Sequence, residues 1–192
     1  MARRYTDGMV ELTVLESPVG PLTLGVRAGK ACALFFGDSA DAVCKAAARW
    51  YPSEPATPAR DGAVGEIAAA LRAYFSGDVH ALDHVGVELN GTPFQRRVWA
   101  ALRTVGPGET ASYRDIARTI GAPAAVRAVG AANGANPVAI IIPCHRIVGA
   151  NGSLTGYGGG LDRKRWLLAH ERGGTDCKVY RRKGEREKRL FS

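Results

Sequence analysis

Apolar and polar residues alternate at the start of the chain. Residues 10–15 have the two-residue period of a half-buried strand. Apolar segments at 22–26 and 31–36 follow, each separated from its neighbour by a short turn that contains glycine. Three strands joined by such turns predict an antiparallel meander.

Helical periodicity follows the meander. Ser39 is suited to cap a helix that runs to about Trp50, and the proline-rich segment 51–58 predicts a loop. A second helix is expected over 62–75, where apolar residues recur every three or four positions. Residues 79–89 show little helical signal and predict a linker that contains one short extended piece.

The second half of the chain is mostly helical. Thr92 as N-cap and Gln95 three residues later predict a helix that stops at the Gly-Pro-Gly of 106–108. Ser112 is suited to cap a second helix, and a third follows directly after Ala122-Pro123 and runs to about Asn133. Helix, glycine turn, helix is typical of the helix-turn-helix motif, although ordinary helical hairpins share the pattern.

The third helix is unusually slim. Alanine and glycine occupy most of its positions, and Arg127 is its only long charged side chain. Small residues favour close packing in a core. They equally favour a close approach to the DNA minor groove, because an ordinary helix is about 10–12 Å across and that groove is about 6 Å wide. The segment alone leaves both interpretations open.

A buried run and a cysteine form the centre of the second half. Five apolar residues at 138–142 predict a buried strand, which Pro143 ends. Cys144 and His145 would then lie at a strand end, beside a cleft. A thiol next to an imidazole is typical of an activated nucleophile, yet most cysteines and histidines in apolar surroundings belong to a core.

The C-terminal part contains a glycine-rich loop, a helix and a basic tail. Six glycines between residues 149 and 160 predict a loop that can wrap a planar ligand. An amphipathic helix is expected over 162–171. Residues 174–192 hold seven basic and three acidic side chains without an apolar period, so we expect a mobile tail.

Composition narrows the class of protein. With 192 residues, 46% of them hydrophobic and 23% charged, the chain is globular. The net charge of +8 and the pI of about 9.6 favour a polyanionic partner, but half of the excess charge lies in the tail. No apolar run can cross a bilayer, so a cytoplasmic protein without membrane contact is expected.

The cysteines and histidines match no compact metal site. The four cysteines contain no C-x-x-C pair, which favours reduced thiols over disulfides or zinc. We therefore expect no metal. The side chains considered as ligands are Cys32, Cys44, His80 and His84.

Six short motifs, in their order and spacing, resemble those of the O6-alkylguanine-DNA alkyltransferases, also called methylated-DNA–protein-cysteine methyltransferases. The motifs are Thr92-Pro93-Phe94-Gln95, Ser112-Tyr113, Arg127-Ala128-Val129-Gly130, Asn136-Pro137, Pro143-Cys144-His145-Arg146 and Gly156-Tyr157-Gly158-Gly159-Gly160. The resemblance is dense from residue 90 to residue 171. Some relatives carry a structural zinc, but the candidate ligands named above do not fall at the expected positions.

The resemblance implies a fold with two domains. Residues 1–89 would form a small α/β domain, ribonuclease H-like, with a three-stranded antiparallel sheet and a linker. Residues 90–173 would form a mostly helical DNA-binding and alkyl-acceptor domain with a winged-helix-like helix-turn-helix. Residues 174–192 would be the basic tail.

The resemblance also implies a single-turnover repair reaction without a cofactor. An alkyl group would pass irreversibly from O6-alkylguanine, and also from O4-alkylthymine, in duplex DNA to Cys144. Glu171 would orient His145, which would deprotonate the thiol through a water. A bridging water suits adjacent residues in an extended segment, because their side chains point to opposite sides. Tyr113 would donate to the leaving guanine, and Asn136 would tie the chain together beside the thiol.

Other residues would contact the DNA or the base. Arg127 would fill the place of a nucleotide flipped out of the duplex, with the helix-turn-helix against the minor groove. Further contacts are implied for Ser112, Ala128, Gly130, Val148, Ser153, Tyr157, Gly158 and Gly159. The expected partner is double-stranded DNA carrying alkylated guanine, bound by a monomer, with cooperative assembly on DNA left open.

Two alternatives from other classes remain at this point. A minor-groove binder without chemistry would bind duplex with a steep salt dependence. A Cys-His hydrolase would use Cys144 as an acyl nucleophile and would need an oxyanion hole.

Overall fold

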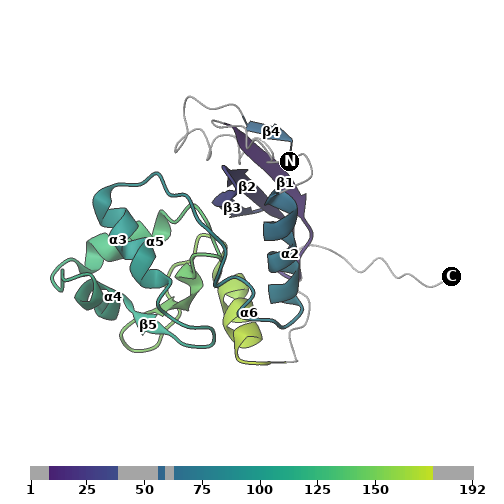
Figure 1. Cartoon of the computed structure of the whole chain (residues 1–192). Helices are drawn as coiled ribbons and strands as arrows, with labels where there is room; N and C mark the ends of the chain where they lie inside the picture. Colours follow the sequence, from purple (N-terminus) through teal and green to yellow (C-terminus); the bar gives the residue numbers. More distant parts are fainter. Residues whose placement is uncertain (1–8, 39–55, 59–62, 175–192) are drawn as a thin grey trace.

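The computed structural model describes residues 9–38, 56–58 and 63–174 (Figure 1). The helix expected from Ser39 to Trp50 and almost all of the basic tail lie outside the described residues. In chain order the elements are β1 (Val10–Leu15), β2 (Leu22–Arg27), β3 (Lys30–Phe36), β4 (Ala56–Pro58), α2 (Ala63–Phe75), α3 (Pro93–Leu102), β5 (Ala111–Ser112), α4 (Tyr113–Thr119), α5 (Val126–Gly134), the 3-10 turn η1 (Cys144–Arg146), β6 (Ile147–Val148) and α6 (Leu161–Glu171).

The first three strands form the predicted antiparallel meander. They belong to a sheet with the order β3-β2-β1-β4, in which β4 pairs in parallel with β1. The expectation that all of 51–58 is a loop was therefore wrong for Ala56–Pro58. A proline is tolerated there because β4 has a neighbour on one side only among the described strands, so its missing N–H breaks no ladder.

The predicted linker follows the edge of the same sheet. Its extended piece pairs with β3 through a parallel bridge between Val87 and Ala31. The amide of Ala31 donates to the carbonyl of Gly86, and the amide of Glu88 donates to the carbonyl of Ala31, both at 2.9 Å. The linker thus carries the chain from α2 across β3 to the helical half.

The predicted capping box is present at α3, and the predicted N-cap Ser112 at α4 also belongs to a capping box. The Thr92 side chain accepts from the Gln95 amide, and the Gln95 side chain accepts in return from the Thr92 amide. Ser112 and Asp115 repeat this arrangement at α4. Each such N-cap stabilises its helix by about 1 kcal/mol, so local sequence fixes where both helices begin.

Helix α5 starts later than expected and has two different faces. It begins at Val126 and has no side-chain cap. Val129 and Ala132 are buried against α3 and α4, and the carbonyl of Ala132 accepts from the Trp99 indole at 2.8 Å. Arg127 and Ala128 are exposed. The small residues therefore pack closely on one face and leave a slim exposed face on the other.

Of residues 138–142, all but the half-buried Ala139 are buried as expected, but they do not form the predicted strand. Val138 bridges Leu34 of β3, and the chain then turns sharply at Ile140, whose φ is 70°. Asn136 stabilises the turn, because its side chain accepts from the Val138 amide at 3.0 Å and donates to the Ile142 carbonyl at 2.9 Å. An aliphatic run signals burial, not extension, so the strand prediction was wrong.

The two halves of the molecule meet around α6. Figure 1 shows α6 between α2 and the helical group formed by α3, α4 and α5. Helix α6 contacts η1, and the short strands β5 and β6 pair in parallel beside it. None of the helices in the described ranges is long and apolar enough to cross a membrane.

Candidate active site

Cys144 lies at the start of η1, not at the end of a strand. Its thiol is buried, with 6% of the residue exposed, and it lines a pocket of about 240 Å³. The pocket is built from the end of β3, the end of α5, the Asn136 turn and the glycine-rich loop. Its lining includes Leu34, Phe35, Phe36, Asn133, Gly134, Asn136, Ala139, Cys144, Gly156, Tyr157, Gly158 and Gly159.

The surroundings of Cys144 act on the thiol in opposite directions. Burial raises the pKa of Cys144 above its usual value. A hydrogen bond with the Asn136 side chain and the positive charge of Lys164 favour the thiolate, but they do not outweigh burial. The thiol therefore needs a proton acceptor before it can act as a nucleophile.

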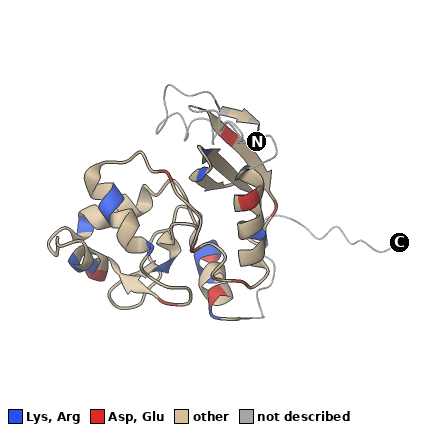
Figure 2. Ribbon diagram, viewed as in Figure 1, with Lys and Arg blue, Asp and Glu red and all other residues tan. Residues whose placement is uncertain are grey.

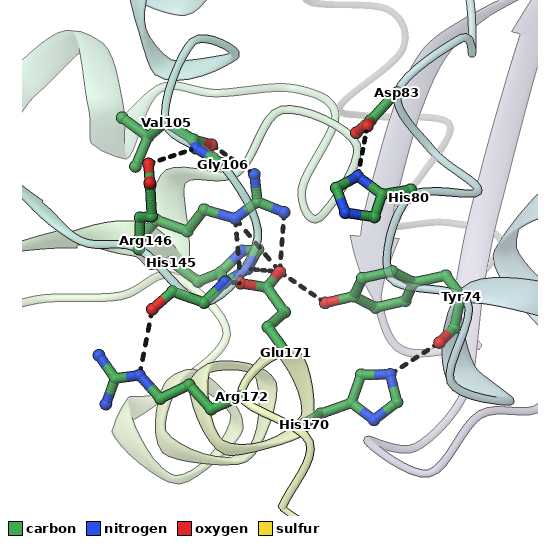
Figure 3. A network of polar contacts seen from close by, with 12 residues as sticks. Tyr74, His80, Asp83, Val105, Gly106, His145, Arg146, His170, Glu171 and Arg172 are labelled. Atoms are coloured by element: carbon green, nitrogen blue, oxygen red, sulfur yellow. Dashed lines mark hydrogen bonds and ion pairs between the residues drawn. The ribbon is translucent and has the colours of Figure 1, made fainter.

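His145 and Glu171 form a buried pair behind the thiol. Nε2 of His145 lies 2.7 Å from Oε1 of Glu171, and both side chains are fully buried (Figure 3). Burial lowers the pKa of His145, although the Glu171 carboxylate opposes this effect, so the imidazole is neutral near neutral pH. With its Nε2–H donated to Glu171, the neutral ring has a lone pair on Nδ1.

That Nδ1 atom is buried and has no hydrogen-bond partner among the described residues. A buried ring nitrogen without a partner is uncommon in native proteins. Such a nitrogen can accept a proton from a neighbouring thiol. The expectation that Cys144 and His145 point to opposite sides of an extended segment rested on the wrong local structure, because both lie in η1; even so, Cys144 lines the pocket while His145 points to α6.

Glu171 is held by donors from three parts of the chain, which are α2, the loop at Gly108 and η1. Arg146 donates through Nε to Oε2 at 3.0 Å and through Nη2 to Oε1 at 2.9 Å. The Gly108 amide donates to Oε2 at 3.2 Å, and the Tyr74 hydroxyl donates to Oε1 at 2.9 Å. Burial alone would raise the pKa of Glu171, but the hydrogen bonds and charges of His145 and Arg146 hold it well below its usual range. The carboxylate stays ionised.

Lys164 is a second buried charge at the site. It is fully buried in α6, and its ammonium group donates to the carbonyls of Ile147 and Thr155. Sequence reasoning did not single it out. A signal existed, because Lys164 lies three residues before Leu167 and seven before Glu171, on the inward face of the same helix.

Phe36 and Arg163 fix one wall of the pocket. The Arg163 guanidinium carbon lies 4.8 Å from the centre of the Phe36 ring, and the Tyr157 ring meets the same ring edge-on at 5.8 Å. Arg163 also donates to the carbonyls of Val19 at 2.8 Å and Gly159 at 2.9 Å. The glycine-rich loop is thereby attached to the N-terminal sheet, a contact that sequence reasoning missed.

The remaining predicted residues divide into two groups. Asn136, Tyr157, Gly158 and Gly159 line the pocket with Cys144. Tyr113 is half-buried at the start of α4, and its ring lies against Gly130 of α5. The Tyr113 hydroxyl is 3.4 Å from that of Thr155.

The second group lies away from the pocket lining. Ser112 caps α4 and pairs with the buried Val148 in the β5–β6 ladder. Arg127, Ala128 and Ser153 are exposed. Among the described residues, no three His, Cys, Asp or Glu side chains lie close enough to hold a metal ion.

Exposed basic residues lie on α3, α4 and α5, and the end of α5 lines the pocket. Figure 2 shows basic positions in blue on α3, α4 and α5, and all of those on these helices are arginines. The exposed ones are Arg96, Arg97, Arg114, Arg118 and Arg127. A surface of this kind attracts phosphates.

Known proteins are similar to this chain in sequence and in fold. The family profile described as "6-O-methylguanine DNA methyltransferase, DNA binding domain" matches residues 93–173. A methylated-DNA–protein-cysteine methyltransferase of Mycolicibacterium paratuberculosis is 48% identical over 164 residues, which are 85% of this chain and 93% of the relative. The chain belongs to the methylated-DNA–protein-cysteine methyltransferase family. The relatives' names describe methyl transfer from methylated DNA to a protein cysteine, which is the enzyme class that the sequence motifs predict, and the matched profile describes a DNA-binding domain.

Solved structures of the family agree with the fold. The structure titled "Crystal structure of Mycobacterium tuberculosis OGT in complex with DNA" is 44% identical, has a TM-score of 0.71, and matches over 86% of this chain and 94% of the other. An O6-methylguanine-DNA methyltransferase from Pyrococcus kodakaraensis, at 22% identity and a TM-score of 0.58 over 85% of this chain and 99% of the other, shows the same fold. The three antiparallel strands and the helical second half are thus those of this family of methyltransferases.

Proposed function

We propose that Cys144 is the alkyl acceptor in the direct repair of O6-alkylguanine, and also of O4-alkylthymine, in duplex DNA. The proposal rests on the position of the Cys144 thiol, which lies between the pocket and the buried imidazole of His145, a possible proton acceptor. Cys144 lines the pocket, and the unpartnered Nδ1 of the neighbouring His145 belongs to a ring oriented by Glu171.

The reaction follows from these groups. His145 accepts the thiol proton through a water, and the Cys144 sulfur attacks the alkyl carbon of the lesion. The carbon–O6 bond breaks, and its electron pair leaves with guanine, which then takes a proton that Tyr113 donates. Tyr113 regains a proton from solvent, and His145 gives up the former thiol proton to solvent, so the protons balance. Because the new thioether has no easy route back to a thiol, each chain reacts once, and no cofactor takes part.

The target atom lies inside a duplex, so the damaged nucleotide must be turned out of the stack. Extrusion costs a few kcal/mol and is cheapest for a poorly paired base. The slim exposed face of α5 supports contact with the minor groove, and the exposed Arg127 is suited to fill the vacated place. The basic residues on α3 and α4 support backbone contacts without sequence preference.

Intact-mass analysis of the full chain tests the proposal. Mixed with methylated duplex, the wild-type protein should gain the mass of one methyl group on Cys144, and Cys144→Ala should gain none. Cys32→Ala is the matched control, because Cys32 is also a buried cysteine but lies in β3. An unmodified Cys144 under excess substrate, or a label on another cysteine, would refute the assignment.

The same experiment separates the two alternative functions. A minor-groove binder would bind the duplex and leave the lesion intact. A hydrolase would turn over repeatedly on an ester without a permanent mass increase.

A further inference from the structure

Tyr74 shares one oxygen of Glu171 with His145. It is a fully buried residue in the last turn of α2, 97 residues from Glu171 in sequence, and its hydroxyl donates to Oε1 at 2.9 Å. The same Oε1 accepts from Nε2 of His145 at 2.7 Å and from Nη2 of Arg146 at 2.9 Å (Figure 3). Nε of Arg146 also donates to Oε1, at 3.2 Å, so three residues share this oxygen through four hydrogen bonds.

The position of Tyr74 is fixed from both sides. Its main-chain carbonyl lies 2.7 Å from Nε2 of His170, the residue next to Glu171. Its ring meets the ring of His170 at 5.1 Å and that of Phe75 at 5.2 Å, both edge-on. Trp166 stacks on His170 at 4.9 Å. The ends of α2 and α6 are thus joined by backbone, hydroxyl and ring contacts around the carboxylate.

We propose that Tyr74 is a positioning residue for the chemistry of Cys144, because its hydroxyl holds the Glu171 carboxylate and limits how strongly that carboxylate raises the basicity of His145. The inference rests on the proposed function in so far as His145 acts as the base. It assigns a part of the reaction centre to α2, which lies outside the matched DNA-binding domain at 93–173.

Several other charged and polar groups act on His145 and Glu171 besides the Tyr74 hydroxyl. Burial raises the pKa of Tyr74 well above its usual value, and the nearby Glu171 raises it further, so the phenol keeps its proton and stays a donor. The groups that act on His145, Glu171 or Tyr74 are Arg146 of η1, Lys164 of α6, the Gly108 amide and, through its own interaction with Glu171, Tyr157 of the glycine-rich loop. Removing only the hydroxyl leaves all of these in place.

Tyr74→Phe tests the inference because it keeps the ring and deletes the donor. Without the phenol, Oε1 binds the His145 N–H more strongly, and the imidazole becomes more basic. A rate that requires neutral His145 then falls at a higher pH than in the wild type. We expect the acidic limb of methyl transfer, followed from about pH 5 to about pH 9, to move up by about half a pH unit, because only one of the hydrogen bonds that share Oε1 is removed.

Phe75→Leu is the matched control. Phe75 packs on Tyr74 and Trp166 in the same cluster, but its side chain has no polar atom that could bind Glu171. It should loosen the packing of α2 on α6 and leave the acidic limb at the wild-type pH. If the acidic limb of Tyr74→Phe lies at the wild-type pH, whatever the maximal rate of methyl transfer, Tyr74 is only a packing residue and the inference is overturned.

A second readout does not depend on the reaction. The nitrogen chemical shifts of the His145 ring, measured by ¹⁵N NMR on the unreacted full chain, should change in Tyr74→Phe and stay at their wild-type values in Phe75→Leu. Unchanged shifts in Tyr74→Phe would contradict the inference. Should the wild type take no methyl group from duplex, the proposed function fails, and the nitrogen shifts still decide the role of Tyr74.

Discussion

At the scale of single residues, Lys164 brings a full positive charge into the interior next to the thiol. Burial lowers the pKa of Lys164, while the interaction with Cys144 acts in the opposite direction. Two carbonyl acceptors, on Ile147 and Thr155, satisfy the ammonium group. A buried cation that is held by carbonyls keeps its charge available to a neighbouring thiolate.

Replacing Lys164 by methionine should raise the pKa of Cys144. Methionine matches the length of the lysine side chain but carries no charge. The rise in the pKa of Cys144 that burial causes is then no longer opposed by a positive charge at this position. We expect a rise of about one unit, which at a fixed pH below that pKa gives about tenfold slower reaction with iodoacetamide. The midpoint of reactivity against pH measures it, and the exposed Lys30→Met serves as control. Equal midpoints in the two variants would contradict the role of Lys164.

The residues around Glu171 show what sequence can and cannot tell at this scale. Cys144, His145 and Glu171 were expected from a resemblance, and the structure brings His145 and Glu171 together at 2.7 Å. Tyr74 could not be expected, because nothing local distinguishes a tyrosine that reaches a carboxylate 97 residues away from one that only packs. Such a contact depends on how α2 docks on α6.

At the scale of elements, the glycine-rich loop depends on its contact with β3. A Cβ on Gly159 would lie 2.5 Å from a ring carbon of Phe36, a ring that Arg163 and Tyr157 already hold. A Cβ on the neighbouring Gly158 would meet nothing within 4 Å. The two glycines are adjacent in one loop but differ in the space that they leave.

Gly159→Ala should therefore damage the site, and Gly158→Ala should not. We expect Gly159→Ala to lower the free energy of unfolding by about 1–3 kcal/mol, as overpacking does, and to slow methyl transfer by moving the loop. Gly158→Ala should stay within about 0.5 kcal/mol of the wild type. Urea unfolding and transfer rates measure both. The double variant Gly159→Ala/Phe36→Ala should recover part of the rate; no recovery would show that the ring is not the obstacle.

Elements whose signals are local were predicted well. Thr92 and Ser112 begin their helices as expected, because a capping box involves only four residues. The run at 138–142 was misjudged, since its path is set by the Asn136 side chain and by pairing with Leu34, a residue of another half of the chain. Strand β4 was missed for the same reason: three residues become a strand only when β1 is there to pair with them.

At the scale of the whole molecule, the two halves share one reaction centre. The N-terminal half supplies the Phe36 wall of the pocket and the Tyr74 donor to Glu171. The C-terminal half supplies the thiol, the imidazole and the basic helices. The expected division at residue 89 therefore separates the chain by composition, and the pocket uses residues from both sides of it.

The net positive charge of the chain, unlike the reaction centre, depends strongly on residues 174–192. The whole chain carries a formal net charge of +8, and residues 174–192 contribute seven basic and three acidic side chains. Binding to phosphates depends on charges that reach DNA from anywhere on the molecule, whereas reaction with a free base depends on the pocket alone. Removing the tail should thus affect duplex and free base differently.

A chain that ends at Gly173 should react with free O6-methylguanine at the wild-type rate and bind methylated duplex more weakly. Each phosphate that the tail neutralises in the full chain adds about 0.9 to the slope of log K against log salt concentration, so the truncated chain should show a shallower slope. If the tail neutralises several phosphates, its removal should weaken binding about tenfold or more near physiological salt. Fluorescence anisotropy over a salt series measures the slope, and mass analysis measures the reaction with the base. A full-length control in which the seven basic residues become glutamine separates charge from length: it should behave like the truncated chain, and a wild-type slope in both variants would show that the tail does not bind phosphates.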